Sequence, residues 1–343
     1  MNCMYRCTIS LLLWALLSSV VGANALHRAA QANAVGTVQQ LLQAHPKWVN
    51  LVDGDSGGTP LHFAVCNGAV DVVRLLLEQG ADTTVQDYAG WTPLHLVLAT
   101  SNREQCARLL LQHNASVNTV DDTGATPLAL ICGEAPVYFS GVSATPNRTV
   151  QERMWRVYGN PDKEPLPFIA GNRALLARIL LAAKADANAA DDQGVTPLHR
   201  AASAQIADLA TQLVKVGANP AARDRSGFTP LHVAAASGVA DTALFLLGID
   251  QQNVNVNDVG PTKETPLHLA ARGNANLVPL LLAHGADPHL ADSSGHTAIW
   301  YAAQFGQLAA LNCLLAQDTT MLTKDNGIQE PAALETLDAG EDS

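Results

Sequence analysis

Short apolar stretches alternate with polar, turn-rich stretches along most of the chain, and the alternation repeats about every 33 residues. In a clear copy, the apolar residues 230–236 lead to Gly238, and a second apolar stretch follows at 241–247. The next copy shows the rest of the pattern, because its second stretch ends at Gly285 and a polar segment follows over 288–296. Glycine at the end of a short apolar stretch is typical of a helix stop. The pattern therefore predicts pairs of short helices, joined by a turn and separated by long hairpin-like loops.

The tetrapeptide Thr-Pro-Leu-His marks the start of each predicted helix pair. Threonine is a good helix N-cap, and proline suits the first helical position. Leucine would be the first core residue, and histidine, which can donate with one ring nitrogen and accept with the other, can connect adjacent repeats. The tetrapeptide begins at Thr59, Thr92, Thr196, Thr229 and Thr265, and altered copies begin at Thr126 and Thr297. Successive intervals between these threonines are 33, 34, 70, 33, 36 and 32 residues.

The sequence Thr-Pro-Leu-His-x-Ala, followed by Gly-Ala-Asp after the second helix, resembles the ankyrin repeat. The resemblance implies an all-α repeat fold, an ankyrin solenoid of helix-turn-helix repeats joined by β-hairpin-like loops. Asn114 and Lys184 stand where the second helix usually ends in glycine, so we expect local strain or a different turn at Lys184. The array of about eight repeats should cover 26–334, with a partial C-terminal cap, at about 26–58, 59–91, 92–125, 126–195, 196–228, 229–264, 265–296 and 297–329.

The interval of 70 residues indicates an insertion of about 36 residues, placed at about 133–170 between the two helices of one repeat. The insertion is rich in aromatic residues and arginine, and includes Tyr138, Trp155 and Tyr158. Such a segment either docks on the array as a structural or regulatory element or binds a partner directly. The last nine residues, 335–343, form an acidic tail that is expected to be disordered.

Residues 1–25 have the pattern of a secretory signal peptide, with Arg6, an apolar run over 9–21 and the small residues 22–25. Cleavage before Leu26 or before Asn24 would leave a protein exported to the periplasm or the extracellular space. An uncleaved anchor is the alternative, although 13 apolar residues are short for a bilayer. Four cysteines would remain, Cys66, Cys106, Cys132 and Cys313, and their scattered spacing favours buried free thiols over disulfides.

The 343 residues carry a formal net charge of −11, which argues against general binding to nucleic acid. Repeat histidines would be about 10 Å apart, too far to share a zinc ion, so we expect neither metal nor other cofactor. The aspartates at the hairpin tips look like solvated turn residues, and no nucleophile or phosphate-binding motif is present. These aspartates are Asp87, Asp121, Asp191, Asp224 and Asp292.

The ankyrin resemblance implies that hairpins and first helices line a concave face that binds another protein. Trp91 and Phe228, which directly precede Thr-Pro, are the kind of large anchors found in binding hot spots. The alternative is that both side chains pack on neighbouring hairpins. The residues expected to contact a partner are Tyr88, Trp91, Arg200, Arg225, Phe228 and His296, with Tyr138 and Trp155 in the insertion.

Three functions follow from these observations. The first is a monomeric, non-catalytic scaffold that binds a protein partner. The second is a structural or regulatory subunit that acts through its insertion. The third is an enzyme with its site in the insertion, which lacks a recognisable nucleophile, base and orienting group.

Overall fold

The computed structural model describes residues 25–99, 102–133, 157–158, 173–204, 206–249 and 254–325. The expected signal peptide, the acidic tail and most of the insertion, including Tyr138 and Trp155, lie outside these residues. The chain divides into two compact units, an N-terminal unit, Met1–Arg225, and a C-terminal unit, Ser226–Ser343.

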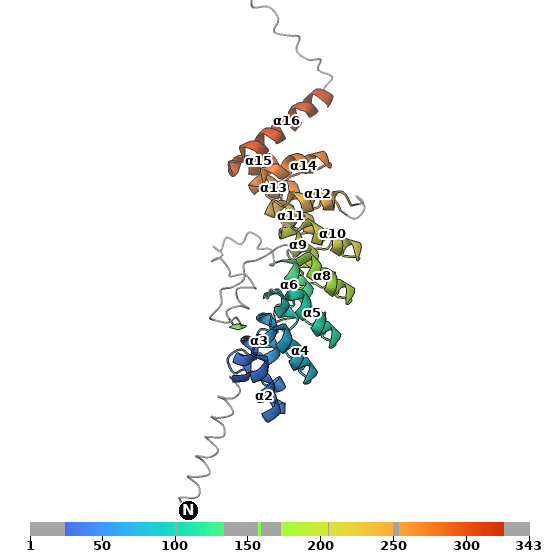
Figure 1. The fold of residues 1–343 in the computed structure, drawn as a ribbon. Helices are drawn as coiled ribbons and strands as arrows, with labels where there is room; N and C mark the ends of the chain where they lie inside the picture. The colour runs from blue at the N-terminus through green and yellow to red at the C-terminus, as the bar shows by residue number, and fades with distance from the viewer. Residues whose placement is uncertain are drawn as a thin grey trace, which may run out of the picture. The chain divides into compact units, whose positions relative to one another are not determined.

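The N-terminal unit is built from short helices that pair within each repeat (Figure 1). After a helical segment at residues 25–31 it contains α2 (Val35–Ala44), the 3₁₀-helix η1 (Pro46–Asn50), α3 (Pro60–Cys66), α4 (Val70–Glu78), η2 (His95–Ala99), α5 (Arg103–Gln112), α6 (Pro127–Cys132), α8 (Arg173–Ala182), α9 (Pro197–Ser203) and α10 (Ala207–Lys215). First helices pack on the second helix of their own repeat, as α3 does on α4 and α9 on α10. The second helices α4, α5, α8 and α10 each contact the next one in that order.

The C-terminal unit continues the same pattern. It contains α11 (Pro230–Ser237), α12 (Ala240–Leu247), α13 (Pro266–Gly273), η4 (Ala275–Leu277), α14 (Val278–Ala283), α15 (Ala298–Gln304) and α16 (Leu308–Asp325). The first helices α11, α13 and α15 pack in a row, and α14 packs on α16. Within the described residues, the only β-structure is an isolated bridge between Ala291 and Thr297. The predicted all-α repeat solenoid is therefore confirmed.

The Thr-Pro-Leu-His segments start the first helices as predicted. Capping boxes form at Thr59, Thr196, Thr229 and Thr265, where the threonine side chain and the histidine three residues later exchange hydrogen bonds with each other's backbone. At Thr92 the tetrapeptide is followed by the 3₁₀-helix η2 rather than an α-helix. The histidine half of the capping box is kept there, because the Thr92 N–H donates to His95 Nδ1 over 3.0 Å.

The repeat histidines also join consecutive repeats. The Thr59 N–H donates to His62 Nδ1 over 3.0 Å, so the ring proton lies on Nε2 and is donated to the Trp91 carbonyl at 3.0 Å. His268 makes the corresponding bond to the His296 carbonyl at 3.1 Å. The predicted role of these histidines as connectors is confirmed in both units. Burial lowers the pKa of His62 to about 4, which keeps the ring neutral as this geometry requires.

The turn after the second helix keeps its left-handed conformation even without glycine. The backbone φ angle is 60° at Asn114 and 68° at Lys184. Lys184 therefore adopts the strained conformation rather than a different turn. Across the long interval, α6 and α8 contact each other as the first and second helix of one repeat. Cys66, Cys106 and Cys132 are buried free thiols, and Cys313 is a half-buried one.

Candidate partner-binding surfaces

The hairpin aspartates form the framework of the loops. Asp87, Asp121, Asp191 and Asp292 are each 8% exposed, so the expectation that they are solvated turn residues is wrong. In each one Oδ1 accepts from two backbone N–H groups further along the hairpin. Asp87 Oδ1, for example, accepts from Ala89 and Trp91, both at 2.8 Å. These carboxylates are buried because they replace backbone hydrogen bonds in a loop that has no regular structure of its own.

The second carboxylate oxygen of these aspartates binds a side-chain donor that differs from repeat to repeat. Trp91 Nε1 donates to Asp121 Oδ2 at 3.2 Å, and Arg200 donates to Asp191 Oδ2 at 2.7 Å. Tyr301 donates to Asp292 Oδ2 at 2.7 Å, and the Tyr158 hydroxyl donates to Asp87 Oδ2 at 2.5 Å. Each of these four hairpins is thus closed by one fixed set of backbone bonds and one variable side chain.

Three of the residues expected on the binding face are buried. Trp91 is 6% exposed, Phe228 4% and Arg200 3%. Trp91 reaches Asp121 of the next hairpin, while Phe228 lies so close to Gly260 that a Cβ there would be 2.8 Å from its ring. Arg200 donates to Asp191 and to the Gly133 carbonyl. The expectation that these side chains project free of the core is therefore wrong, and the alternative of packing on neighbouring hairpins holds for Trp91 and Phe228.

Tyr88 and Arg225 are exposed, and both occupy the position directly after a hairpin aspartate. Backbone hydrogen bonds join these positions to the preceding hairpin, from Tyr88 to Ser56 at 2.9 Å and from Arg225 to Gln193 at 2.8 Å. Asp122 and Asp192 make the same bond, to Ala89 at 3.2 Å and to Thr123 at 3.0 Å, and their side chains are also exposed. We call the four residues of the N-terminal unit the tip row: Tyr88, Asp122, Asp192 and Arg225.

His296 belongs to an aromatic cluster in the C-terminal unit. Its ring stacks on Trp300 with centroids 3.6 Å apart, and Trp300 meets Tyr301 edge to face at 5.2 Å. Trp300 is 40% exposed and Phe305, which stacks on Tyr301, is 45% exposed. Trp300 occupies the position that histidine holds in most other repeats. The altered tetrapeptide that begins at Thr297 did not predict an exposed aromatic side chain there. Burial and the neighbouring Asp292 carboxylate raise the pKa of Tyr301 to about 12, so it stays a donor.

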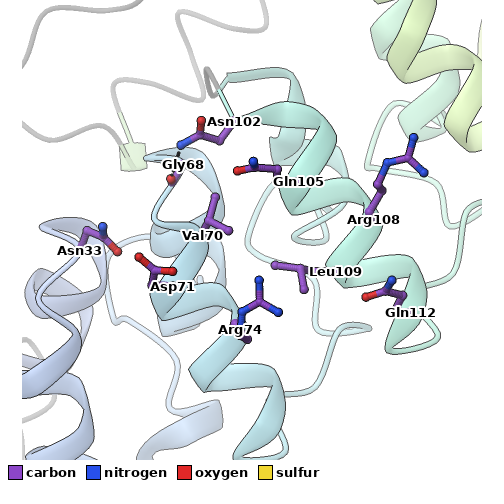
Figure 2. A pocket seen from close by; sticks show the side chains of 10 residues that line it. All are labelled: Asn33, Gly68, Val70, Asp71, Arg74, Asn102, Gln105, Arg108, Leu109 and Gln112. Carbon is purple, nitrogen blue, oxygen red and sulfur yellow. Dashed lines mark hydrogen bonds between the residues drawn. The ribbon is translucent and has the colours of Figure 1, made fainter.

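The second helices of the N-terminal unit form an open groove of about 600 Å³ between α4 and α5 (Figure 2). Arg74 from α4 and Leu109 from α5 line it, and the Asn102 side chain donates to the Gly68 carbonyl at 2.7 Å at one end. Arg108 is bound to Glu104 by an exposed ion pair at 3.0 Å. The groove is open to solvent, and it lies on helices for which the sequence analysis predicted no binding role.

Among the residues that the structure describes, no group of three or more His, Cys, Asp or Glu side chains could hold a metal ion. The described helices include none that is both long and apolar enough to cross a membrane.

Comparison with known proteins places this geometry in a family. A family model of ankyrin repeats in three copies matches residues 3–87, 168–258 and 251–325, and a single ankyrin-repeat model matches 89–122. Mouse protein phosphatase 1 regulatory subunit 12A is 45% identical over 51 residues, which is 15% of this chain and 5% of that protein. The human transient receptor potential cation channel subfamily A member 1 is 46% identical over 71 residues, 20% of this chain and 6% of that protein.

A yeast protein described as probable 26S proteasome regulatory subunit p28 is 34% identical over 82 residues, 23% of this chain and 36% of that protein. The similarity thus spans about a third or less of the length of each of these relatives. The family models match most of the chain. The structure is consistent with them, because it shows repeated capping boxes, histidine links between repeats and hairpins closed by aspartate. The chain belongs to the ankyrin-repeat family.

Proposed function

We propose that the chain is a scaffold without catalysis of its own, which binds a protein partner through the tip row of its N-terminal unit. Ankyrin repeats generally mediate protein–protein interaction, and two of the relatives above carry names of regulatory subunits. The observation that carries the proposal is the tip row itself. Its four side chains are exposed at equivalent positions on hairpins that backbone hydrogen bonds hold in register.

The chemistry of the tip row indicates the kind of surface it would meet. Tyr88 is 69% exposed and supplies a large, rigid, amphipathic contact. Asp122 and Asp192 follow, and Arg225 ends the row, so a partner would present cations opposite the middle and an acid near the end. Among the described residues, two sets of groups that could serve acid–base chemistry have structural tasks instead. The hairpin carboxylates bind donors with both oxygens, and the repeat histidines bond through both ring nitrogens.

Capture experiments in the native host test the tip row. Tagged full-length chain is crosslinked in cells, and captured proteins are quantified by mass spectrometry for wild type, Asp122→Lys and Glu78→Lys. Glu78, the last residue of α4, is also exposed, so both variants change the surface charge equally. We expect a partner that is kept by Glu78→Lys and reduced at least about tenfold by Asp122→Lys, since like charges across an interface are unfavourable. Equal capture by all three chains would refute the tip row, and no partner for wild type would refute the scaffold.

The same proposal places the protein outside the cytoplasm, in the periplasm or the extracellular space. Its support is the sequence of residues 1–25, with an apolar run followed by small residues before Leu26. Mass spectrometry of the natural protein's N-terminal peptide is expected to begin at Leu26 or Asn24. An intact Met1 on the mature protein would contradict cleavage.

A further inference from the structure

Tyr158 is held in a closed pocket of the N-terminal unit, although it belongs to the long insertion. Its side chain is 0% exposed, whereas the preceding Val157 is 46% exposed. The Tyr158 hydroxyl donates to Asp87 Oδ2 at 2.5 Å, across 71 positions of the sequence. Burial, and then the Asp87 carboxylate, raise the pKa of Tyr158 well above its usual range, so the hydroxyl keeps its proton.

The walls of the pocket fit an aromatic ring. The His62 ring stacks on Tyr158 with centroids 5.9 Å apart and an interplanar angle of 23°, and Phe63 meets it edge to face at 4.9 Å and 81°. Gly58 forms the floor, because a Cβ there would lie 2.5 Å from the Tyr158 ring. Only a residue without a side chain leaves this space open.

The pocket also recognises the backbone of its occupant. The Tyr158 carbonyl accepts from Asn67 Nδ2 at 2.6 Å and from Gln31 Nε2 at 3.1 Å. Asn67 caps α3, and Gln31 ends the helical segment at residues 25–31. Ring, hydroxyl and carbonyl are therefore each bound by side chains of the repeat at 59–91, and Gln31 of the preceding repeat adds a second donor to the carbonyl.

The helix that follows the Asp87 hairpin offers no donor to Asp87 Oδ2, unlike the helices that follow the Asp191 and Asp292 hairpins. Arg200 and Tyr301 each stand nine positions after the aspartate that they bind, at the residue that follows the repeat histidine or its replacement. Nine positions after Asp87 the residue is Leu96, which has no polar group. Asp87 Oδ2 would be a buried acceptor without this donor, and leaving such a group unpaired is unfavourable. The pocket is thus complementary to a phenol.

We propose that this pocket is a binding site for a tyrosine carried by a short peptide segment, that Tyr158 is its tethered ligand, and that a tyrosine presented by a partner protein competes for it. The proposal goes beyond the tip row, because it concerns other residues and a different recognition element. It also gives the insertion a role, since the insertion supplies an occupant that a partner must displace.

Tethering explains why the pocket is filled in the isolated chain. A linked ligand has an effective concentration on the order of a millimolar, so a competitor binds only to the fraction of molecules with an empty pocket. Removing the Tyr158 side chain should therefore expose the site to a peptide added in solution.

A synthetic peptide with the sequence of residues 152–163, labelled with fluorescein, tests this by anisotropy against full-length chain. We expect saturable binding to Tyr158→Ala and at least about tenfold weaker binding to wild type. A peptide with phenylalanine in place of tyrosine should bind Tyr158→Ala about tenfold or more weakly, because Asp87 Oδ2 then lacks its donor. Adding Gly58→Ala to Tyr158→Ala fills the pocket and should abolish binding while far-UV circular dichroism is kept.

Absence of binding to folded Tyr158→Ala would overturn the proposal, as would equal binding to wild type or indifference to Gly58→Ala. If Tyr158→Ala does not fold by itself, refolding in the presence of p-cresol or the peptide should restore its circular dichroism, and failure of both to do so would also overturn it. The tip row is intact in these chains. A lost peptide signal with an unchanged response to Asp122→Lys in cells therefore refutes the pocket alone, and the reverse result refutes the tip row alone.

Discussion

At the scale of single residues, the hairpin aspartates decide how the loops are stabilised. One oxygen closes the backbone, and the other takes a hydroxyl, an indole N–H or a guanidinium. The most demanding of these is the ion pair between Arg200 and Asp191, whose side chains are each 4% exposed. Arg200 also donates to the Gly133 carbonyl at 3.1 Å, at the end of α6.

Replacing Arg200 with methionine should therefore leave a buried carboxylate without its partner. We expect Arg200→Met to lower the free energy of unfolding by about 3–5 kcal/mol, measured by urea denaturation. The matched variant Arg108→Met removes the exposed pair with Glu104 and should lower it by less than about 1 kcal/mol. Similar losses in both variants would show that burial of the Arg200 pair is not what makes it important.

At the scale of elements, the sequence predicted the first helices of the repeats well because one local motif starts most of them. Thr, Pro and His act within four consecutive residues, so the capping boxes at Thr59, Thr196, Thr229 and Thr265 could be located without a structure. The 3₁₀-helix η2 could not, since the same motif precedes it at Thr92.

The binding residues were harder to predict because exposure depends on contacts between repeats. Trp91 and Phe228 were expected to be free as they directly precede Thr-Pro, yet the next hairpin covers both. Tyr158 was visible only as one aromatic residue of the insertion, and its partner Asp87 lies 71 positions away. Leu96, at the position that holds Arg200 and Tyr301 in other repeats, was not a distinctive signal, because Leu130 and Val233 stand at the same position after Asp121 and Asp224.

At the scale of the whole molecule, the row of neutral histidines makes stability depend on pH. Burial is the main reason that the pKa of His62 and of His95 is lowered to about 4, and it outweighs the nearby Asp87 and Asp121 carboxylates, which act to raise the pKa of His95. The unfolded chain, with a histidine pKa near 6.5, binds more protons than the folded chain between about pH 6.5 and 4. Stability is therefore complete above pH 6.5 and falls as the pH drops through this window.

We expect urea denaturation between pH 7 and pH 4.5 to show this loss, which approaches about 3 kcal/mol per histidine near pH 4. The variant His62→Gln/His95→Gln is the control, because glutamine at this position can complete a capping box without titrating. Its unfolding free energy should change much less over the same range. An equal slope for wild type and variant would show that other groups cause the acid sensitivity.

The donor that Tyr158 supplies to Asp87 also limits how the chain can be divided. The hairpins of Asp191 and Asp292 take their donor from the next helix in the chain, nine positions on, so each closes within a pair of consecutive repeats. The hairpin of Asp87 is completed only by a residue two repeats downstream, so a fragment truncated at Cys132, or a library that shuffles these repeats, would carry an unfinished module. Modularity in this protein is thus a property of pairs of consecutive repeats, and an engineered array built from it should begin with pairs that supply their own donor.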